Sequence, residues 1–347
     1  MVAGQMVVVY GAYGHTGRFM VAELRERGFV PVLSGRDADK LKALAVSTDE
    51  PHVRPAPVDD PAALDRALAG AAAVINCAGP FATTAAPLVE AALRAGIPYL
   101  DVAGEVEATV DTFAHFADRA REAGAVVVPA MAFYGGLGDL LATAAMGDWE
   151  KADEAHIAYA LDSWHPTPGT RAAGAVSRAR RGGRRLRFAN GKMEYRDDSA
   201  PTVDWLFPDP VGARTVFGEF LTADVVTAPT HLPVSEFSTY MTVDAVKDVL
   251  APDSPAPAAV DERGRSAQTF LVDVVVRSGG RERRAVARGR DIYAVSAPLA
   301  VEAVHRILAG RTRTVGVAAA GALFDAADFL RALSPHISFE LSERPGE

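Results

Sequence analysis

The chain has 347 residues, 49% of them hydrophobic and 23% charged, and a formal net charge of -8. This composition excludes extensive disorder, and the negative charge makes nucleic acid an improbable partner. The single Cys77 excludes an internal disulfide and a thiolate metal cluster.

The first segment, Met1 to Val9, has no basic region before its apolar residues, so we interpret it as a first strand and not as a signal peptide. No apolar run reaches the roughly 18 to 20 residues needed to span a bilayer. We therefore expect a soluble, cytoplasmic protein without a membrane span.

Strands and helices alternate through the first third of the chain, which predicts a doubly wound parallel sheet of the Rossmann type. The expected strands are 6–10, 30–33, 72–75, 99–102 and 125–128, and the expected helices are 19–27, 38–45, 87–95 and 110–123.

The pattern changes after about residue 155 to longer alternating segments, which predict a largely antiparallel sheet in a second, α+β domain. Its expected strands are 156–161, 184–188, 219–227, 237–243 and 269–276, and helices follow at 298–309 and 321–333. We place a Rossmann domain at 1–130 and a substrate or dimerisation domain at 131–297, with helices of about 298–341 packing back on the first domain.

A glycine-rich turn joins the first strand to the first helix, with Gly11, Gly14 and Gly17 at three-residue intervals. Such glycines permit a tight turn, close approach of the pyrophosphate and close helix packing, while the helix N-terminus presents free amides to the anion. The turn residues Tyr13, Gly14, His15 and Thr16 are therefore expected to contact a dinucleotide.

The end of the second expected strand distinguishes NADP(H) from NAD(H). Arg36 offers a planar cation to the 2'-phosphate, and Ser34 offers a hydroxyl donor. Asp37 more naturally caps the helix that begins at Ala38. The alternative for Arg36 is a solvated turn residue. Asp59 either lies near the adenine or caps the helix that starts at Pro61.

Two runs in the first domain, Val74-Ile75-Asn76-Cys77-Ala78-Gly79-Pro80-Phe81 and Gly96 to Glu105, resemble the saccharopine dehydrogenase-like oxidoreductases. The likeness is closer to the trans-acting enoyl reductases of that family, which act on C=C bonds, than to the saccharopine reductases, which act on C=N bonds. It implies that Cys77, Ala78, Gly79 and Pro80 lie beside the nicotinamide end. Cys77 itself is better explained as a small packed residue than as a nucleophile.

Hydride transfer needs no protein nucleophile, so the catalytic signal in the sequence is faint. Glu105, Tyr134 and His165 are the candidates for orienting the substrate or donating a proton, and each has a structural alternative. For Glu105 the alternative is helix capping or an ion pair. Asp139 is expected to cap the helix through Leu140, and no histidine spacing predicts a metal site.

A basic run stands out in this acidic chain, and it either receives an anion, such as a phosphopantetheine arm, a coenzyme A tail or an acidic carrier protein, or forms a solvated flank. It comprises Arg178, Arg180, Arg181, Arg184, Arg185 and Arg187. The resulting hypothesis is an NADPH-dependent reductase of a conjugated C=C or a C=N bond, acting on a small metabolite or a carrier-bound intermediate of secondary or lipid metabolism. The alternative is a non-catalytic NADP-binding sensor or scaffold. A homodimer is expected by analogy.

Overall fold

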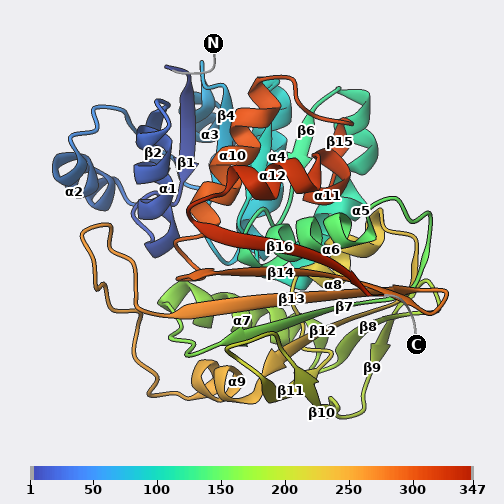
Figure 1. The fold of residues 1–347 in the computed structure, drawn as a ribbon. Helices are drawn as coiled ribbons and strands as arrows, with labels where there is room; N and C mark the ends of the chain where they lie inside the picture. Colours follow the sequence, from blue (N-terminus) through green and yellow to red (C-terminus); the bar gives the residue numbers. More distant parts are fainter. Residues whose placement is uncertain (1–3, 345–347) are drawn as a thin grey trace.

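The computed structural model describes residues 4–344, which form two sheets with helices around and between them (Figure 1). The first sheet is parallel, with strand order β15-β6-β5-β4-β1-β2-β3. Its strands are β1 (Met6–Tyr10), β2 (Val30–Gly35), β3 (Val53–Pro55), β4 (Ala73–Asn76), β5 (Tyr99–Asp101), β6 (Val126–Val128) and β15 (Gly316–Val317).

Helices cover both faces of this sheet, as the predicted Rossmann fold requires. Because the sheet is covered on both sides, Val7, Val8 and Val9 of β1 are all fully buried, which explains the continuous apolar run. The helices are α1 (His15–Glu26), α2 (Ala38–Thr48), α3 (Pro61–Leu68), α4 (Phe81–Ala95), α5 (Val106–Glu122) and α10 (Ser296–Leu308).

The second sheet is mixed, and in the described residues its main path runs β10-β11-β12-β7-β13-β14-β16, with the β8–β9 hairpin beside β12. These strands are β7 (Ala152–Leu161), β8 (Arg185–Ala189), β9 (Lys192–Arg196), β10 (Thr202–Leu206), β11 (Ala213–Gly218), β12 (Val234–Thr242), β13 (Thr269–Ser278), β14 (Arg281–Arg290) and β16 (Ile337–Arg344). The predicted fold class, a Rossmann domain with a second α+β domain, is confirmed.

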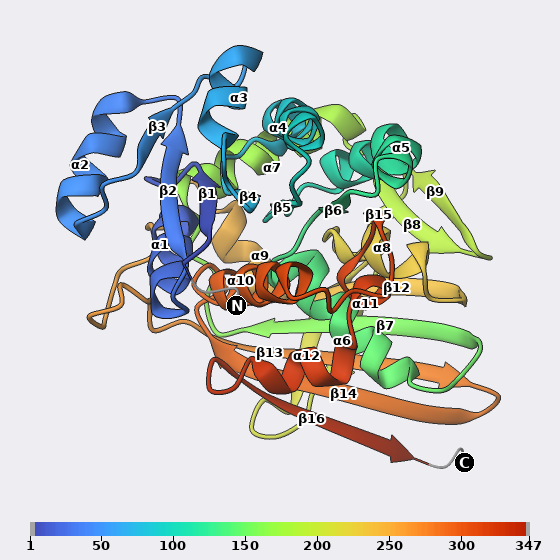
Figure 2. The ribbon, with the colours of Figure 1, turned by 90° about the horizontal axis from the view of Figure 1, so that it is seen from above.

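The helical segments of the second domain and of the returning chain are η1 (Phe133–Leu137), α6 (Gly138–Met146), α7 (Pro168–Arg181), α8 (Asp224–Thr227), η2 (Ala228–Thr230), α9 (Val243–Leu250), α11 (Ala320–Leu323) and α12 (Ala326–Ala332). Seen from above, α10 lies beside α1, and α6 lies over the long strands of the second sheet (Figure 2). Within residues 4–344, no helix combines the length and the apolar character that a membrane crossing requires.

Several expected elements are wrong in detail. Strands β7 and β12 run parallel, with Ser238 beside His156, although antiparallel pairing was expected. The segment 219–227 is no strand: it turns into the short α8, where Asp224 is buried against the Tyr159 hydroxyl. The helix expected over 321–333 breaks, because Asp325 caps a separate α12 through the Asp328 amide.

Helix α4 begins at Phe81, well before the expected start at Pro87. Proline is common at the first position of a helix, which made Pro87 a plausible start, but here it lies inside α4. The earlier start matters for the site, because it places the N-terminus of α4 directly after the loop that follows β4.

The chain returns to the first domain after completing most of the second. Helix α10 packs against α1, and β15 pairs with β6 at the sheet edge. The division of the chain at about residue 130 stays a prediction. The end of the chain differs from the expected helices of about 298–341, because α12 packs on α6 and β16 pairs with β14 in the second sheet.

Candidate functional site

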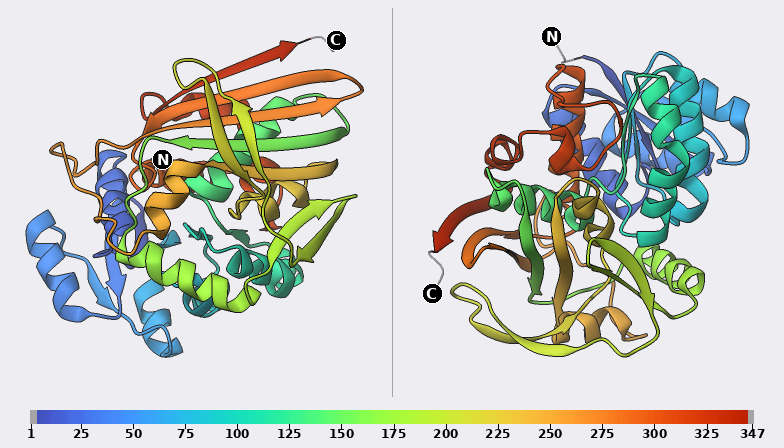
Figure 3. Two further views of the ribbon diagram at one scale, coloured as in Figure 1. Left: turned by 90° about the horizontal axis from the view of Figure 1, so that it is seen from below. Right: turned by 90° about the vertical axis from the view of Figure 1, so that its right-hand side faces the viewer.

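A cavity of about 1730 Å³ opens between the two domains. Pockets for one small ligand usually measure about 300–1,000 Å³, so this volume suits a dinucleotide together with a second molecule. The Rossmann domain contributes the glycine turn and the loops after β2, β3, β4 and β5, while the second domain contributes η1, α7, α9 and the loop after β11. Helix α7 lies between the two domains in the view from below (Figure 3).

The glycine turn has the geometry of a pyrophosphate cradle. Gly11 adopts φ 84°, and an added Cβ there would lie 2.9 Å from Ala78. A Cβ on Gly17 would lie 2.2 Å from the Gly11 carbonyl oxygen, so this glycine lets α1 pack closely on the turn. Gly14 is the N-cap of α1 and gives it no side-chain cap, so the first-turn amides remain available to an anion.

Four turn residues expected to contact the cofactor line the cavity: Tyr13, Gly14, His15 and Thr16. The His15 ring packs edge-on against Tyr293 at 5.3 Å, and burial lowers the pKa of His15. A neutral imidazole therefore stands at this end of the cavity, where it adds no positive charge of its own.

Two cations stand at the end of the cavity beyond β2. Arg36 is exposed, lines the cavity and has no hydrogen-bond or ion-pair partner within residues 4–344. Lys40 lines the same region, with its Nζ 5.7 Å from the centroid of the Tyr13 ring and 3.2 Å from the Asp37 carboxylate. Lys40 was missed from the sequence, where only its helical position four residues after Arg36 pointed to it.

The expectation that the Ser34 hydroxyl donates to the 2'-phosphate is wrong. Its side chain is fully buried, and its hydroxyl donates to the Arg54 carbonyl at 2.8 Å, across to β3. Of the two roles left open for Asp59, capping is ruled out: Asp60 caps α3 through the Ala63 amide, while Asp59 lines the cavity. Asp37 caps α2, as expected.

The loop after β4 passes along the cavity, which Cys77, Ala78, Gly79 and Pro80 all line. Asn76 shapes this loop, because its side-chain oxygen accepts from the Ala78 amide at 3.0 Å. Burial raises the pKa of the Cys77 thiol, so it stays protonated and is a packed residue, not a nucleophile.

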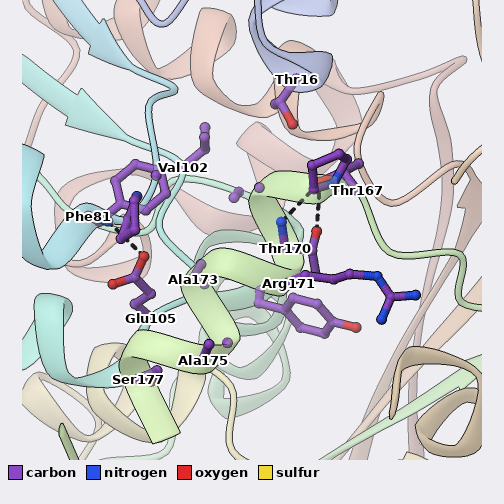
Figure 4. Close-up of a pocket in the computed structure, with 18 of the residues that line it drawn as sticks. Thr16, Phe81, Val102, Glu105, Thr167, Thr170, Arg171, Ala173, Ala175 and Ser177 are labelled. Carbon is purple, nitrogen blue, oxygen red and sulfur yellow. Dashed lines mark hydrogen bonds between the residues drawn. The ribbon is translucent and has the colours of Figure 1, made fainter. Parts of the chain in front are cut away.

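Glu105 lines the cavity but is committed to a structural role. Its two carboxylate oxygens accept from the amides of Phe81, at 2.7 Å, and Ala82, at 3.1 Å, and so satisfy the N-terminus of α4 (Figure 4). Burial raises the pKa of Glu105, against the effect of these two bonds. The capping alternative is therefore the one that the geometry supports.

His165 is not among the residues that line the cavity. The backbone carbonyl of His165 accepts a hydrogen bond from the Tyr293 hydroxyl at 3.2 Å. The loop that carries it turns the neighbouring Trp164 toward the cavity instead. The loop that carries His165 therefore faces the cavity, as expected, but His165 itself does not line it, which counts against its candidate role as a substrate ligand or proton donor.

Tyr134 is the sequence candidate whose chemistry stays open. It lines the cavity, and its buried hydroxyl has no hydrogen-bond partner within residues 4–344. Burial raises its pKa well above the ordinary value for tyrosine, with the nearby Tyr293 and Asp224 contributing in the same direction. The phenol is therefore a neutral hydrogen-bond donor at ordinary pH.

Tyr293 was missed from the sequence, although it organises this part of the cavity. Its hydroxyl receives hydrogen bonds from the Trp164 indole at 3.3 Å and the Thr167 amide at 3.4 Å, and lies 3.0 Å from the Thr170 hydroxyl. These bonds fix the N-terminus of α7 beside the loop before α10. The only signal in the sequence is Asp291, whose carboxylate accepts from the Tyr293 amide in an Asx turn.

The expectation that Asp139 caps α6 is wrong. Its carboxylate is fully buried, 2.6 Å from the His231 Nε2, and it accepts from the Gly321 amide at 2.7 Å. Burial disfavours the charged form of His231, but the Asp139 carboxylate outweighs this and raises the pKa of the imidazole. This pair joins α6 to the returning chain and lies outside the cavity.

Most arginines of the basic run are paired with carboxylates. Arg180 pairs with Asp111, Arg181 with Glu107, and Arg185 with both Asp198 and Glu219. Arg187 likewise pairs with Glu236, and Arg184 stacks over Tyr195. Arg178, Arg181 and Arg185 line the cavity, and of these three Arg178 has no hydrogen-bond or ion-pair partner in the described part of the chain.

Residues 7–128 match the family model of the saccharopine dehydrogenase NADP binding domain. A probable mitochondrial saccharopine dehydrogenase-like oxidoreductase of Arabidopsis thaliana is 32% identical over 142 residues, 37% of this chain and 31% of that protein. A trans-acting enoyl reductase of Mycobacterium tuberculosis is 28% identical over 134 residues, 37% of this chain and 32% of that protein. Each match therefore takes in about a third of the relative's length.

The structure of apo saccharopine dehydrogenase (L-Glu forming) from Saccharomyces cerevisiae aligns with 98% of this chain and 100% of its own, at a TM-score of 0.66 and 14% identity. This likeness extends to the second domain, and at this identity it shows the fold alone. The resemblance stated from the sequence and the expected cofactor, NADP(H), are both confirmed by the family match.

Proposed function

Because residues 7–128 belong to the saccharopine dehydrogenase NADP binding domain family, we propose that the chain is an NADPH-dependent reductase of an activated double bond. The acceptor is a conjugated C=C or a C=N bond in a small metabolite or in an intermediate carried by a protein or by coenzyme A. The observation that carries the proposal is Tyr134, which lines a cavity shared by the cofactor domain and the second domain and whose buried hydroxyl has no hydrogen-bond partner within residues 4–344.

When bound, the nicotinamide supplies the hydride. The chain's own part is to hold the dinucleotide, align the acceptor and exclude water. The α1 amides and the glycine turn suit the pyrophosphate, and Arg36 with Lys40 suits the 2'-phosphate. The loop from Cys77 to Pro80 then limits where the reacting end can lie.

Tyr134 has the role of donor in this proposal. Its phenol stays protonated because burial raises its pKa, so it can donate a hydrogen bond to the carbonyl oxygen or the imine nitrogen of the acceptor. That bond strengthens as negative charge builds on the acceptor atom, which is the condition for lowering the barrier. Glu105 and Tyr293 hold the surrounding walls through their hydrogen bonds.

The alternative is an NADP-binding sensor or scaffold without turnover. It is favoured by the loss of two of the three expected donors, because Glu105 caps α4 and His165 does not line the cavity. The two hypotheses differ in whether bound NADPH is consumed.

The test is NADPH oxidation with a panel of conjugated enones and cyclic imines, with NADPH binding measured in parallel by fluorescence. The reductase hypothesis expects oxidation with at least one acceptor class, and expects the turnover number to fall in Tyr134→Phe while NADPH binding holds. Tight NADPH binding without oxidation across both classes would establish the alternative instead.

A role in secondary or lipid metabolism, a cytoplasmic location and a homodimer are parts of the same proposal. They derive from the sequence, and the matches to relatives cover only about a third of each relative's length. Native mass spectrometry of the purified chain tests the homodimer directly.

A further inference from the structure

The cavity continues past the cofactor region into the second domain along a row of aromatic rings. Tyr134 lies 5.5 Å from Trp164, and Trp164 lies 5.9 Å from Phe220, measured between ring centroids. All three residues line the cavity. Four further apolar side chains line the same part of the cavity: Phe217, Leu221, Val246 and Val249. We use the name aromatic arm for the part of the cavity lined by these four and by the three aromatic residues above.

Helix α7 forms another wall of the cavity, and small residues leave that wall open (Figure 4). A Cβ added to Gly174 would meet no other atom within 4 Å. Arg171, Gly174 and Arg178 follow one another at spacings of three and four residues, so they share one face of α7, and all three line the cavity.

The cations on this face are not neutralised by protein carboxylates. Arg171 donates to the carbonyl oxygens of Ala251 and Ser254, which carry no charge, and Arg178 has no partner within residues 4–344. In a chain of net charge -8, an unpaired arginine in a cavity is a site for an anion of the ligand.

The length of the ligand follows from α7. Thr170, at the start of the helix, is hydrogen-bonded to Tyr293 beside the Trp164 ring, close to the proposed donor. Arg178 is eight residues farther along, a rise of roughly 12 Å at 1.5 Å per residue. This span corresponds to roughly ten carbons of an extended chain.

We propose that the substrate is an elongated, amphipathic anion: its apolar body lies along the aromatic arm, and its carboxylate or phosphate binds Arg178. This assignment deepens the proposed reductase function, since it names the substrate class of the same cavity. Apolar area and an unpaired cation together would give the affinity, so neither a short acid nor a neutral chain should bind as well.

Calorimetric binding to the NADP+-saturated protein tests this without turnover. The probes are decanoate, decyl phosphate, butyrate and decanol. We expect decanoate or decyl phosphate to bind at least about tenfold more tightly than butyrate and decanol. The stronger of the two anions then identifies the group that Arg178 receives. Equal affinity for decanoate, decyl phosphate and decanol would overturn the proposal, as would no binding of any probe.

Two pairs of variants, each a test and a control, locate the site. Arg178→Gln should weaken binding of the anionic probe about tenfold or more and leave decanol unchanged, whereas Arg180→Gln, which removes a cation paired with Asp111, should have little effect. Gly174→Leu should block the anionic probe, and Ala172→Leu, on an exposed position of α7 that does not line the cavity, should not.

Gly174→Leu raises the helix propensity of α7 and Ala172→Leu lowers it only slightly, so loss of folding is not the expected cause of lost binding. Equal effects of the two glutamine variants, or of the two leucine variants, would place the probe elsewhere and overturn the assignment. If the probes bind as expected while enones and imines are not reduced, the reductase proposal fails and this site stands. If enones or imines are reduced but the probes show no preference for chain length or charge, the reductase proposal stands and this site assignment fails.

Discussion

The Arg181 guanidinium of α7 lies 2.9 Å from the Glu107 carboxylate of α5, and the Ser177 hydroxyl donates to the same carboxylate. Glu107 is 6% exposed, so this pair joins the second domain to the Rossmann domain in a largely dry contact. One turn away, the pair between Arg180 and Asp111 joins the same two helices in the solvent.

Loss of the carboxylate should cost very different amounts of stability in these two neighbouring pairs. Glu107→Gln should destabilise the protein by about 3 kcal/mol, because it leaves a mostly buried guanidinium without its counter-charge. Asp111→Asn should cost less than about 1 kcal/mol, since exposed pairs contribute little. Urea unfolding of both variants measures the difference, and similar losses would mean that the Glu107 pair is hydrated in solution.

Arg36→Ala should weaken NADPH binding by about 1.5–3 kcal/mol and leave NADH binding nearly unchanged, because only NADPH carries the 2'-phosphate. Lys40 remains in the variant and should preserve part of the preference. Fluorescence titration with both cofactors measures the shift. Arg94→Ala removes an arginine paired with Asp65, away from the cavity, and serves as the control. A parallel loss for the two cofactors would show that Arg36 does not select between them.

Gly17→Ala should destabilise the Rossmann domain by about 1–3 kcal/mol, because its Cβ would lie 2.2 Å from the Gly11 carbonyl oxygen. Gly104→Ala should be tolerated, since no atom lies within 4 Å of the added Cβ. Thermal unfolding compares the two. An unchanged midpoint for Gly17→Ala would show that α1 can move away from the turn without cost.

Tyr134→Phe should lower kcat at least about 100-fold with a smaller change in KM, the usual effect of losing a positioned donor. Because the pKa of Tyr134 is raised, this phenol should add no limb to the pH–rate profile between pH 6 and 9. Tyr195→Phe, on the exposed hairpin, is the control. A wild-type kcat in Tyr134→Phe would remove Tyr134 from the reaction.

Asp224 should make stability fall as the pH rises. Burial raises its pKa from 3.8 to about 6, and the Tyr159 hydroxyl donates to it at 2.8 Å. The folded protein holds this proton more tightly than the unfolded chain does, so its contribution is complete below pH 4 and is lost as the pH passes 6.

The measurement is the stability difference between Asp224→Asn and the wild type, from urea unfolding at a series of pH values. The difference should shift in favour of the variant between pH 4 and 7, by about 1.4 kcal/mol for each pKa unit. Asp65→Asn, an exposed carboxyl paired with Arg94, is the comparison variant. A difference independent of pH would show that the Asp224 carboxyl is hydrated in solution.

Local patterns predicted much of the first domain. The apolar run of β1, the turn from Gly11 to Gly17 and the cap at Asp37 each depend on neighbours in the sequence, and each lies where it was expected. Arg36 could be placed at the cavity for the same reason, since the end of the second strand in this fold has a fixed relation to the glycine turn.

The predictions that failed concern residues whose role is set by partners distant in the sequence. Ser34 is buried by a bond to Arg54, and Asp139 is held by His231 and by the Gly321 amide. Tyr293 reaches the cavity because α10 returns to α1, so the local Asx turn at Asp291 could not predict its position there. Segment 219–227 alternates like a strand, yet burial of Asp224 against Tyr159 decides its shape.

The edge strand β15 is made of Gly316 and Val317, which pair with Val126 and Val127. On the ribosome, β6 emerges long before its partner, so its outer hydrogen-bonding edge stays open while all the strands from β7 to β14 are synthesised. Open edges attract other chains. Expression yield should therefore depend on translation speed through this interval, and on chaperones that shelter nascent chains.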